Sequence, residues 1–471
     1  MMTSLGARST CLRHGLGVLI CWLALASCSQ DKGSNPVQQG WEYDARSGGA
    51  ATTMDGSVNA FGNASPALSM DERLRFQTGN SFFRNNWVAA PSSTTARDGL
   101  GPFFDARSCG SCHTFDGRGR PPAFPGDPAS GMVYKLGRAG VDGLLPDDIY
   151  GGAMNSFAIP GVEPEGRVEV AYVEEPGNYP DGTVYSLRRP VYKVYGGVYG
   201  AVDGATHVLP RIAPQMIGMG LLEAVDQATL QRIAGSQVAP VSGTLRYVPD
   251  PIAAHPVVGR FGWKAGQPSV RTQTAAAFVN DIGITNTLHE KEDITSAQWG
   301  RLGTLPDGGH PEIDDDMLDA VAFYSATLAV PARRNVDDPA VVRGARNFTA
   351  VRCTSCHVPV LTTGSQAVVA AYRNQTIHPF TDLLLHDMGS GLADPIGDGI
   401  VGAGEWRTPP LWGLGLIAVV NKHTFLLHDG RARTIEEAIL WHDGEAASSR
   451  SAFKSLNAAE RADLLRFMES L

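Results

Sequence analysis

Hydrophobic and polar positions divide the chain into an apolar leader, a polar stretch and a long region with helical periodicity. Leu16 to Leu25 form the apolar run, with basic Arg8 and Arg13 before it and small residues at positions 26 and 27. A basic segment, a short apolar core and small residues form the pattern of a secretory signal peptide. The apolar run is too short to span a membrane. We therefore expect residues 1–27 to be a signal peptide and the protein to be exported.

The segment after the apolar run is predicted to be a lipid-anchored linker. Residues 25–28 read Leu-Ala-Ser-Cys, which resembles a bacterial lipobox and implies cleavage before Cys28 and acylation of its thiol. Ser29 after the cysteine favours the outer membrane, facing the periplasm; ordinary cleavage would instead leave a soluble periplasmic protein. Residues 29 to about 68 are rich in Ser, Gly, Asn and Ala. We expect residues 28–68 to form a flexible linker.

Helical periodicity and capping signals dominate the remaining chain. Helices are predicted over 268–282 with Ser269 as N-cap, over 312–330, over 434–442, and over 457–471 with Asn457 at a capped start. Residues 118–210 are rich in Gly, Pro and Tyr, which favours loops and short hairpins. The expected fold is therefore mainly α, with loop and short β-hairpin insertions in its first half.

Two copies of one motif carry the chemistry. Residues 109–113 read CGSCH and residues 353–357 read CTSCH, and Cys-x-x-Cys-His is the attachment signature of c-type haem. Positions i, i+3 and i+4 share one helix face, so two thiols and an imidazole can meet one porphyrin. The sequence therefore predicts two covalent haems, held by Cys109, Cys112, Cys353 and Cys356. His113 and His357 are the expected proximal iron ligands.

The cysteine count supports this assignment. Of 7 cysteines, four lie in the motifs, Cys11 and Cys21 lie in the leader, and only Cys28 remains. The alternatives are a structural zinc site, which would need both motifs to combine, and a redox dithiol, which does not need the histidine. Haem uses every residue of both motifs, so we favour it.

A weak internal repeat surrounds the motifs. Gly79 and Phe83 precede the first motif, and Gly344 and Phe348 precede the second. The motifs are later followed by Arg and Pro, in RIAP at 211–214 and RTPP at 407–410. We interpret each Gly-x-x-x-Phe as the entry helix of a cytochrome c-like domain. The expected domains are 69–335, with an insertion, and 336–471.

Net charge excludes one class of partner. The chain carries a charge of −9, and loss of two arginines with the leader makes it more negative. Nucleic acid, whose phosphates attract basic surfaces, is not expected as a partner.

Several long strings resemble the di-haem oxidoreductase family, which is similar to the bacterial di-haem cytochrome c peroxidases. The resemblance covers about 80 to 471, and its strings include DGLGPFFDARSCGSCHTFDGRG at 98–119, FTDLLLHDMGSGLAD at 380–394 and LLHDGRARTIEEAILWHDGEA at 426–446. It implies two haems and a peroxidase-like oxidoreductase, with a small cytochrome or cupredoxin as electron donor and hydrogen peroxide as a candidate oxidant.

The resemblance also suggests the distal ligand of the second haem. In the peroxidase relatives, the ninth residue of a helix that follows His-Asp-Gly is this ligand, and counting from Thr434 gives His442. Met388 and His386 are rivals, and His428 is expected to make structural hydrogen bonds. Bis-histidine ligation would lower the reduction potential relative to His/Met ligation.

Around the first haem, the resemblance implies an acid–base glutamate near an open iron. Glu223, in an apolar setting, is the first candidate, with a helix-surface or salt-bridge role as the alternative. Arg211 is expected to pair a haem propionate or to orient the pocket. Gln273 is a candidate distal donor, and Trp263 and Trp406 are candidates to lie beside the haems or in the core.

Two function classes remain open from the sequence. The first is a peroxidase-like enzyme in which electrons enter at the second haem and reach the first, where the oxidant is reduced. The second is a non-catalytic electron carrier of the cell envelope. An open sixth position on the first iron would distinguish them.

Overall fold

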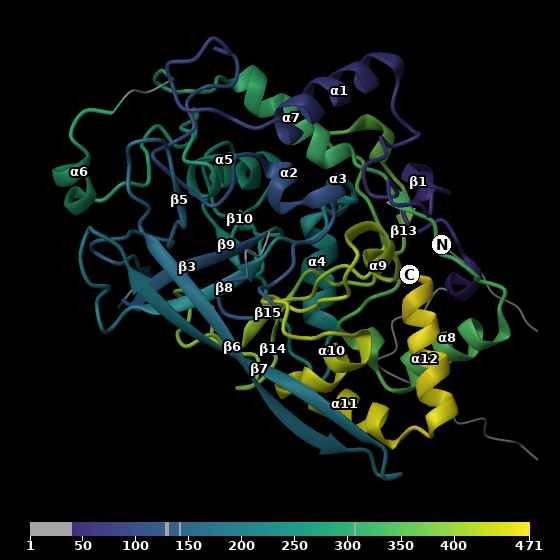
Figure 1. Cartoon of the computed structure of the whole chain (residues 1–471). Helices are drawn as coiled ribbons and strands as arrows, with labels where there is room; N and C mark the ends of the chain where they lie inside the picture. Colours follow the sequence, from purple (N-terminus) through teal and green to yellow (C-terminus); the bar gives the residue numbers. More distant parts are fainter. Residues whose placement is uncertain (1–39, 128–130, 141–142, 306–307) are drawn as a thin grey trace, which may run out of the picture. The chain divides into compact units, whose positions relative to one another are not determined.

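Two helix pairs, each crossing at a glycine, frame the two motifs (Figure 1). Helix α1 (Met70–Arg84) packs against α7 (Asp315–Thr327), and α8 (Pro339–Ala350) packs against α12 (Ala458–Ser470). A Cβ on Gly79 would lie 2.1 Å from the Ala320 carbonyl oxygen, and one on Gly344 would lie 2.0 Å from that of Asp463. Only glycine permits such close backbone approach. The Gly-x-x-x-Phe repeat therefore marks the same helix crossing twice.

The computed structural model describes residues 40–127, 131–140, 143–305 and 308–471. Within residues 38–471, contacts form one unit, and the predicted division between 335 and 336 stays a prediction. No helix in the described ranges is long and apolar enough to cross a bilayer. The signal peptide and Cys28 lie outside the described residues.

The predicted helices are confirmed, with the caps that start them. Ser269 accepts a hydrogen bond from the Thr272 N–H at the start of α5 (Val270–Asp281), and Asn457 forms a capping box with Glu460 on α12. Helices α7 and α10 (Ile435–Trp441) occupy the other two predicted ranges. The remaining helices are α2 (Cys109–Cys112), α3 (Met219–Glu223), α4 (Gln227–Ser236), α6 (Ser296–Leu302), α9 (Ile417–Asn421) and α11 (Ala447–Ser455).

The expected fold, mainly α with loop and hairpin insertions, is confirmed in part: the described residues are mixed, with 31% helix and 19% strand in many small sheets. The longest strands, β6 (Gly166–Asn178) and β7 (Val184–Gly196), form one antiparallel hairpin where short hairpins were predicted. The three-stranded sheet has the order β4 (Leu144–Leu145), β3 (Met132–Ala139), β8 (His207–Ile212). Two-stranded pairs complete the set: β1 (Thr52–Thr53) with β11 (Val330–Pro331), β2 (Phe103–Phe104) with β5 (Phe157–Ala158), β9 (Tyr247–Val248) with β10 (Val257–Val258), β12 (Leu361–Thr362) with β13 (Thr376–Ile377), and β14 (Leu385–Asp387) with β15 (Glu405–Arg407).

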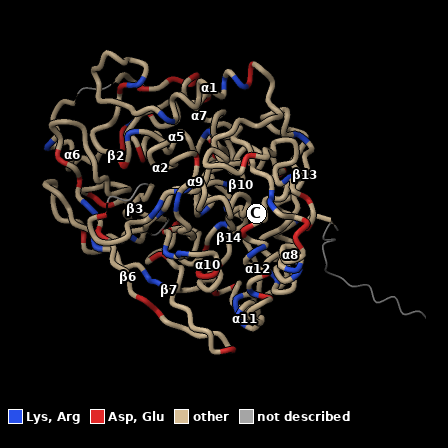
Figure 2. The backbone as a smooth tube through the Cα atoms, turned by 45° about the vertical axis from the view of Figure 1, so that its right-hand side comes forward, with Lys and Arg blue, Asp and Glu red and all other residues tan. Residues whose placement is uncertain are grey.

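The β6–β7 hairpin belongs to the first half of the chain but rests on the second half, beside α10 (Figure 1). Arg188 donates hydrogen bonds to the carbonyls of Gly430 and Arg431, and Arg461 pairs with Asp181 at 2.6 Å. Figure 2 shows basic and acidic positions interspersed along the described chain, this hairpin included. The insertion therefore joins the two halves through specific contacts.

Residues 40–68, the described part of the predicted flexible linker, are packed against the rest of the fold, so the prediction of a flexible linker is wrong for this stretch. Trp41 is 3% exposed and packs edge-on against Phe380 and Phe467, and Phe61 is fully buried. Strand β1 pairs in parallel with β11. Trp41, Phe61 and Leu68 reach the core, whereas Tyr43 and Met54 stay exposed, so the composition of this stretch did not reveal its three buried anchors.

Candidate functional site

One cavity of about 660 Å³ is lined by every cysteine and histidine of the two motifs. The residues concerned are Cys109, Cys112, His113, Cys353, Cys356 and His357. All four cysteines are free of disulfides. Burial raises the pKa of Cys109 and of Cys353 to about 12, whereas a redox dithiol needs a lowered pKa. The structure therefore brings both motifs to a common space and argues against a redox dithiol.

The two motif histidines are held in the same way. The His113 Nδ1 lies 2.7 Å from the Pro214 carbonyl oxygen, and the His357 Nδ1 lies 2.9 Å from that of Phe380. A carbonyl only accepts, so Nδ1–H donates and the Nε2 lone pair is left for a metal. Pro214 ends the RIAP string, but RTPP does not supply the corresponding carbonyl in the second half. The two strings therefore do not share this role, and their pairing as a repeat stays a prediction.

The phenylalanine of each Gly-x-x-x-Phe string packs against its motif histidine. The ring centroids of Phe83 and His113 are 6.2 Å apart, and those of Phe348 and His357 are 6.3 Å apart. The sequence repeat is therefore a structural repeat of helix, aromatic ring and imidazole.

His442 faces His357 across the cavity. The two ring centroids are 6.4 Å apart, and His442 donates its Nδ1–H to the Ala438 carbonyl oxygen at 2.7 Å, which leaves Nε2 free. Two imidazoles on opposite sides of one metal, each bound at roughly 2 Å, would have ring centres about 6 Å apart. Burial lowers the pKa of His442, and lowers that of His357 to about 4, so both stay in the neutral form that binds metal. The geometry fits the predicted pair, and ligation by His442 stays a prediction.

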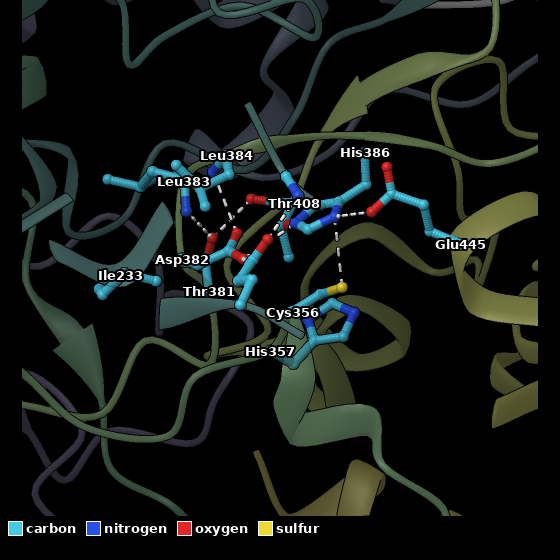
Figure 3. A network of polar contacts seen from close by, with 12 residues as sticks. Ile233, Cys356, His357, Thr381, Asp382, Leu383, Leu384, His386, Thr408 and Glu445 are labelled. Atoms are coloured by element: carbon cyan, nitrogen blue, oxygen red, sulfur yellow. Dashed lines mark hydrogen bonds and ion pairs between the residues drawn. The ribbon is translucent and has the colours of Figure 1, made fainter. Parts of the chain in front are cut away.

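His386 has no free ring nitrogen (Figure 3). Its Nε2 lies 2.9 Å from Asp382, and its Nδ1 lies 2.7 Å from Glu445 and 3.6 Å from the Cys356 sulfur. Burial alone would lower the pKa of His386, but the hydrogen bonds to Asp382, Cys356 and Glu445 raise it to about 12. His386 could bind a metal only after one of these hydrogen bonds is broken, because an imidazolium has no lone pair to offer. Met388 lines the cavity, so it remains the rival to His442.

Arg211 lines the cavity but already has a carboxylate partner. It makes two hydrogen bonds to Asp394, at 2.9 and 2.6 Å, and lies 4.8 Å from the centre of the Trp406 ring. Of its two predicted roles, the structure favours orienting the pocket. His428 stacks on Trp406 with ring centroids 3.8 Å apart. Trp406, Trp263, Gln273 and His428 all line the cavity.

Glu223 is not among the residues that line the cavity. It accepts a hydrogen bond at 2.9 Å from the N–H of Val270, the first residue of α5. Burial raises its pKa, as expected. Its position supports a role in fixing the start of a helix rather than in proton transfer in the cavity.

Asp281, at the end of α5, is an acid that the sequence gave no reason to select. It lines the cavity, and its charge acts on the thiols of Cys109 and Cys112. Burial raises its pKa to about 7, against the opposing effect of Lys135, which also lines the cavity. A carboxyl group with such a pKa exchanges protons readily near neutral pH. Asp281 carried no sequence signal beyond its place at a helix end.

Comparisons with known proteins identify the family of the chain. The family model described as "Di-haem oxidoreductase, putative peroxidase" matches residues 42–138 and 161–471. No curated protein matches. A solved structure of Kuenenia stuttgartiensis hydrazine synthase, pressurised with 20 bar xenon, is 15% identical, with 88% of this chain and 91% of that chain covered and a TM-score of 0.37. The family match spans most of the chain, and the chain belongs to the di-haem oxidoreductase family.

Proposed function

We propose that this protein is an exported, peroxidase-type di-haem oxidoreductase whose first motif forms the substrate site and whose second motif receives electrons from a donor protein. One observation carries the proposal. His357 faces a second imidazole, that of His442, whereas the ring partner of His113 is Phe83, and no other pair of histidine rings lies in contact within the described residues. Such an enzyme requires one iron whose ligand positions are all filled, for electron transfer, and one iron with a position open to the substrate.

When bound, the haems supply iron centres that exchange single electrons. Four thiols of the chain would attach them covalently, and the Nε2 atoms of His113 and His357 would be free to bind iron because their Nδ1 atoms are held by carbonyls. His442 would supply a second imidazole beside that of His357.

Peroxide reduction also needs proton transfer. Conversion of one hydrogen peroxide to two waters consumes two electrons, from the donor protein, and two protons. The Asp281 carboxyl group, with a pKa of about 7 beside the first motif, is suited to move a proton between the peroxide oxygens. The positive charge of Lys135 acts to lower the pKa of Asp281.

The test is peroxide consumption by the holoprotein with a reduced small cytochrome as donor. We expect turnover in the parent and a loss in kcat/KM of roughly 10²-fold or more in Asp281→Asn, because general acid–base help is worth about that much. Glu223→Gln is the matched control, a buried carboxyl outside the cavity lining, and should turn over normally. No turnover in the parent would indicate an electron carrier. Normal turnover in Asp281→Asn would place the proton-transfer group elsewhere.

We further propose that the protein is held at the outer membrane by acylation of Cys28. The support is the apolar run followed by Leu-Ala-Ser-Cys and then Ser29. Cys28→Ser should move the protein from the membrane fraction to the soluble periplasmic fraction. Unchanged membrane association would contradict the anchor.

A further inference from the structure

Two buried arginines line the cavity without a hydrogen bond to any carboxylate of the described residues. Asp429 acts on Arg118, and Asp382 on Arg407, only through their charge. Other cations of the same wall are paired: Arg211 with Asp394 at 2.6 Å, and Arg246 with Asp398 at 2.8 Å. Arg118 and Arg407 also line the cavity, and no carboxylate among the described residues accepts a hydrogen bond from either. We propose that Arg118 and Arg407 form the site that binds the propionate carboxylates of the haems, an inference that rests on the two haems of the proposed function.

Arg118 is 5% exposed, and backbone oxygens take only part of its hydrogen-bonding capacity. Its Nε donates to the Phe425 carbonyl at 2.9 Å and its Nη2 to the Leu427 carbonyl, while the guanidinium carbon lies 5.4 Å from the centre of the Trp263 ring. Burial lowers its pKa to about 10, so it is charged at neutral pH. Its Nη1 has no hydrogen bond within the described residues.

Arg407 repeats this arrangement from the other half of the chain. It is 8% exposed, and its Nε and Nη1 donate to the carbonyls of Gly262 and Thr408 at 3.0 and 3.2 Å. Its backbone N–H donates to the Trp263 carbonyl at 3.0 Å. Burial lowers its pKa to about 10, and its Nη2 has no hydrogen bond within the described residues. Both arginines therefore flank one segment, Gly262 and Trp263, on the cavity wall.

The N–H groups of the two arginines indicate which kind of ligand would bind them. A guanidinium offers five N–H groups in a fixed plane that match a carboxylate, and each of these two arginines keeps one terminal nitrogen without a hydrogen bond within the described residues. Each haem carries two propionates, so the cofactors bring four carboxylates into this cavity. A free carboxylate ligand would have the same chemistry, and the experiment must separate the two sources.

The experiment uses resonance Raman spectra of the purified holoprotein, with Arg118→Gln and Arg407→Gln. We expect each variant to shift a propionate bending band and to give one reduction potential a new dependence on pH, because a propionate without its guanidinium titrates closer to neutral pH. Arg246→Gln is the matched control. It removes one positive charge from the same cavity wall, but Arg246 is already paired with Asp398, so these bands should stay unchanged. Unshifted bands in both Arg118 and Arg407 variants would overturn the proposal.

Two further arms complete the test. If a glutamine variant does not accumulate with both haems, the corresponding lysine variant keeps the charge and should shift the same band by less. Titration of the parent holoprotein with acetate should leave its Soret band unchanged, because the propionates already occupy the arginines. An acetate-induced shift that disappears in the glutamine variants would instead assign the site to a free carboxylate ligand. None of these readouts depends on peroxide turnover, so failure here is distinguishable from failure of the proposed function.

Discussion

Glu165 shows how burial sets the chemistry of a single residue away from the haem motifs. Its side chain is fully buried, accepts hydrogen bonds from the backbone and side-chain amides of Asn155 at 2.6 and 2.9 Å, and accepts another from Gln298. Burial raises the pKa of Glu165 to about 7, although these hydrogen bonds oppose the shift. The folded protein therefore binds a proton here that the unfolded chain releases at lower pH.

The pH dependence of stability follows from that shift. With the pKa raised from 4.5 to about 7, the contribution of Glu165 is complete below pH 4.5 and is lost as pH rises through about 7. The loss is on the order of 3 kcal/mol. Glu165→Gln should remove it, which thermal unfolding of the holoprotein at about pH 5 and about pH 8 would measure. The control is Glu163→Gln, at an exposed position nearby. A parent that is as stable at the higher pH as at the lower would refute this account.

Individual site residues differed in how far the sequence could specify them. Cys109, His113 and their counterparts followed from a motif whose spacing is fixed by covalent chemistry. His442 was implied by the resemblance to the peroxidases, whose ligand position counted from Thr434 falls on it, and the structure brings its ring to face that of His357. Asp281 could not be predicted, because its importance comes from burial beside the first motif, which no local pattern encodes.

At the scale of elements, the two helix crossings offer a matched test. Gly79→Ala and Gly344→Ala would each place a Cβ within 2.1 Å of a backbone oxygen, so the helices must separate. We expect each to lose about 2 kcal/mol of unfolding free energy, the usual cost of overpacking. Gly235→Ala in α4 meets no atom within 4 Å and should be neutral or slightly stabilising. Thermal unfolding monitored by circular dichroism would measure all three. Equal midpoints for all three would show that the crossings tolerate a side chain.

Helices were easier to predict than strands for a physical reason. Ser269 and Asn457 predict helix starts because their side chains can cap the backbone N–H groups of the first turn, and both are N-caps in the structure. The β6–β7 hairpin and residues 40–68 depend on distant partners: Arg188 bonds to Arg431, and Trp41 packs on Phe467. Contacts of such long sequence separation leave no local pattern to recognise.

At the scale of the whole molecule, the two motifs lie far apart in sequence but line one cavity. Residues of both halves meet there: Trp263 of the first half accepts a hydrogen bond from the Arg407 N–H of the second, and Arg211 pairs with Asp394. The same arrangement of helix, phenylalanine and histidine surrounds each motif, and one difference between the two sites is His442, whose ring faces that of His357 only. That asymmetry is the central claim of the proposed mechanism.

The most direct test is the low-temperature electron paramagnetic resonance spectrum of the ferric holoprotein. We predict one low-spin signal typical of two imidazole ligands and one high-spin signal from the accessible iron. His442→Ala should abolish the low-spin signal while both haems stay covalently attached on denaturing gels. A bis-imidazole signal that survives in His442→Ala, or a parent with two low-spin centres and no high-spin signal, would contradict the account.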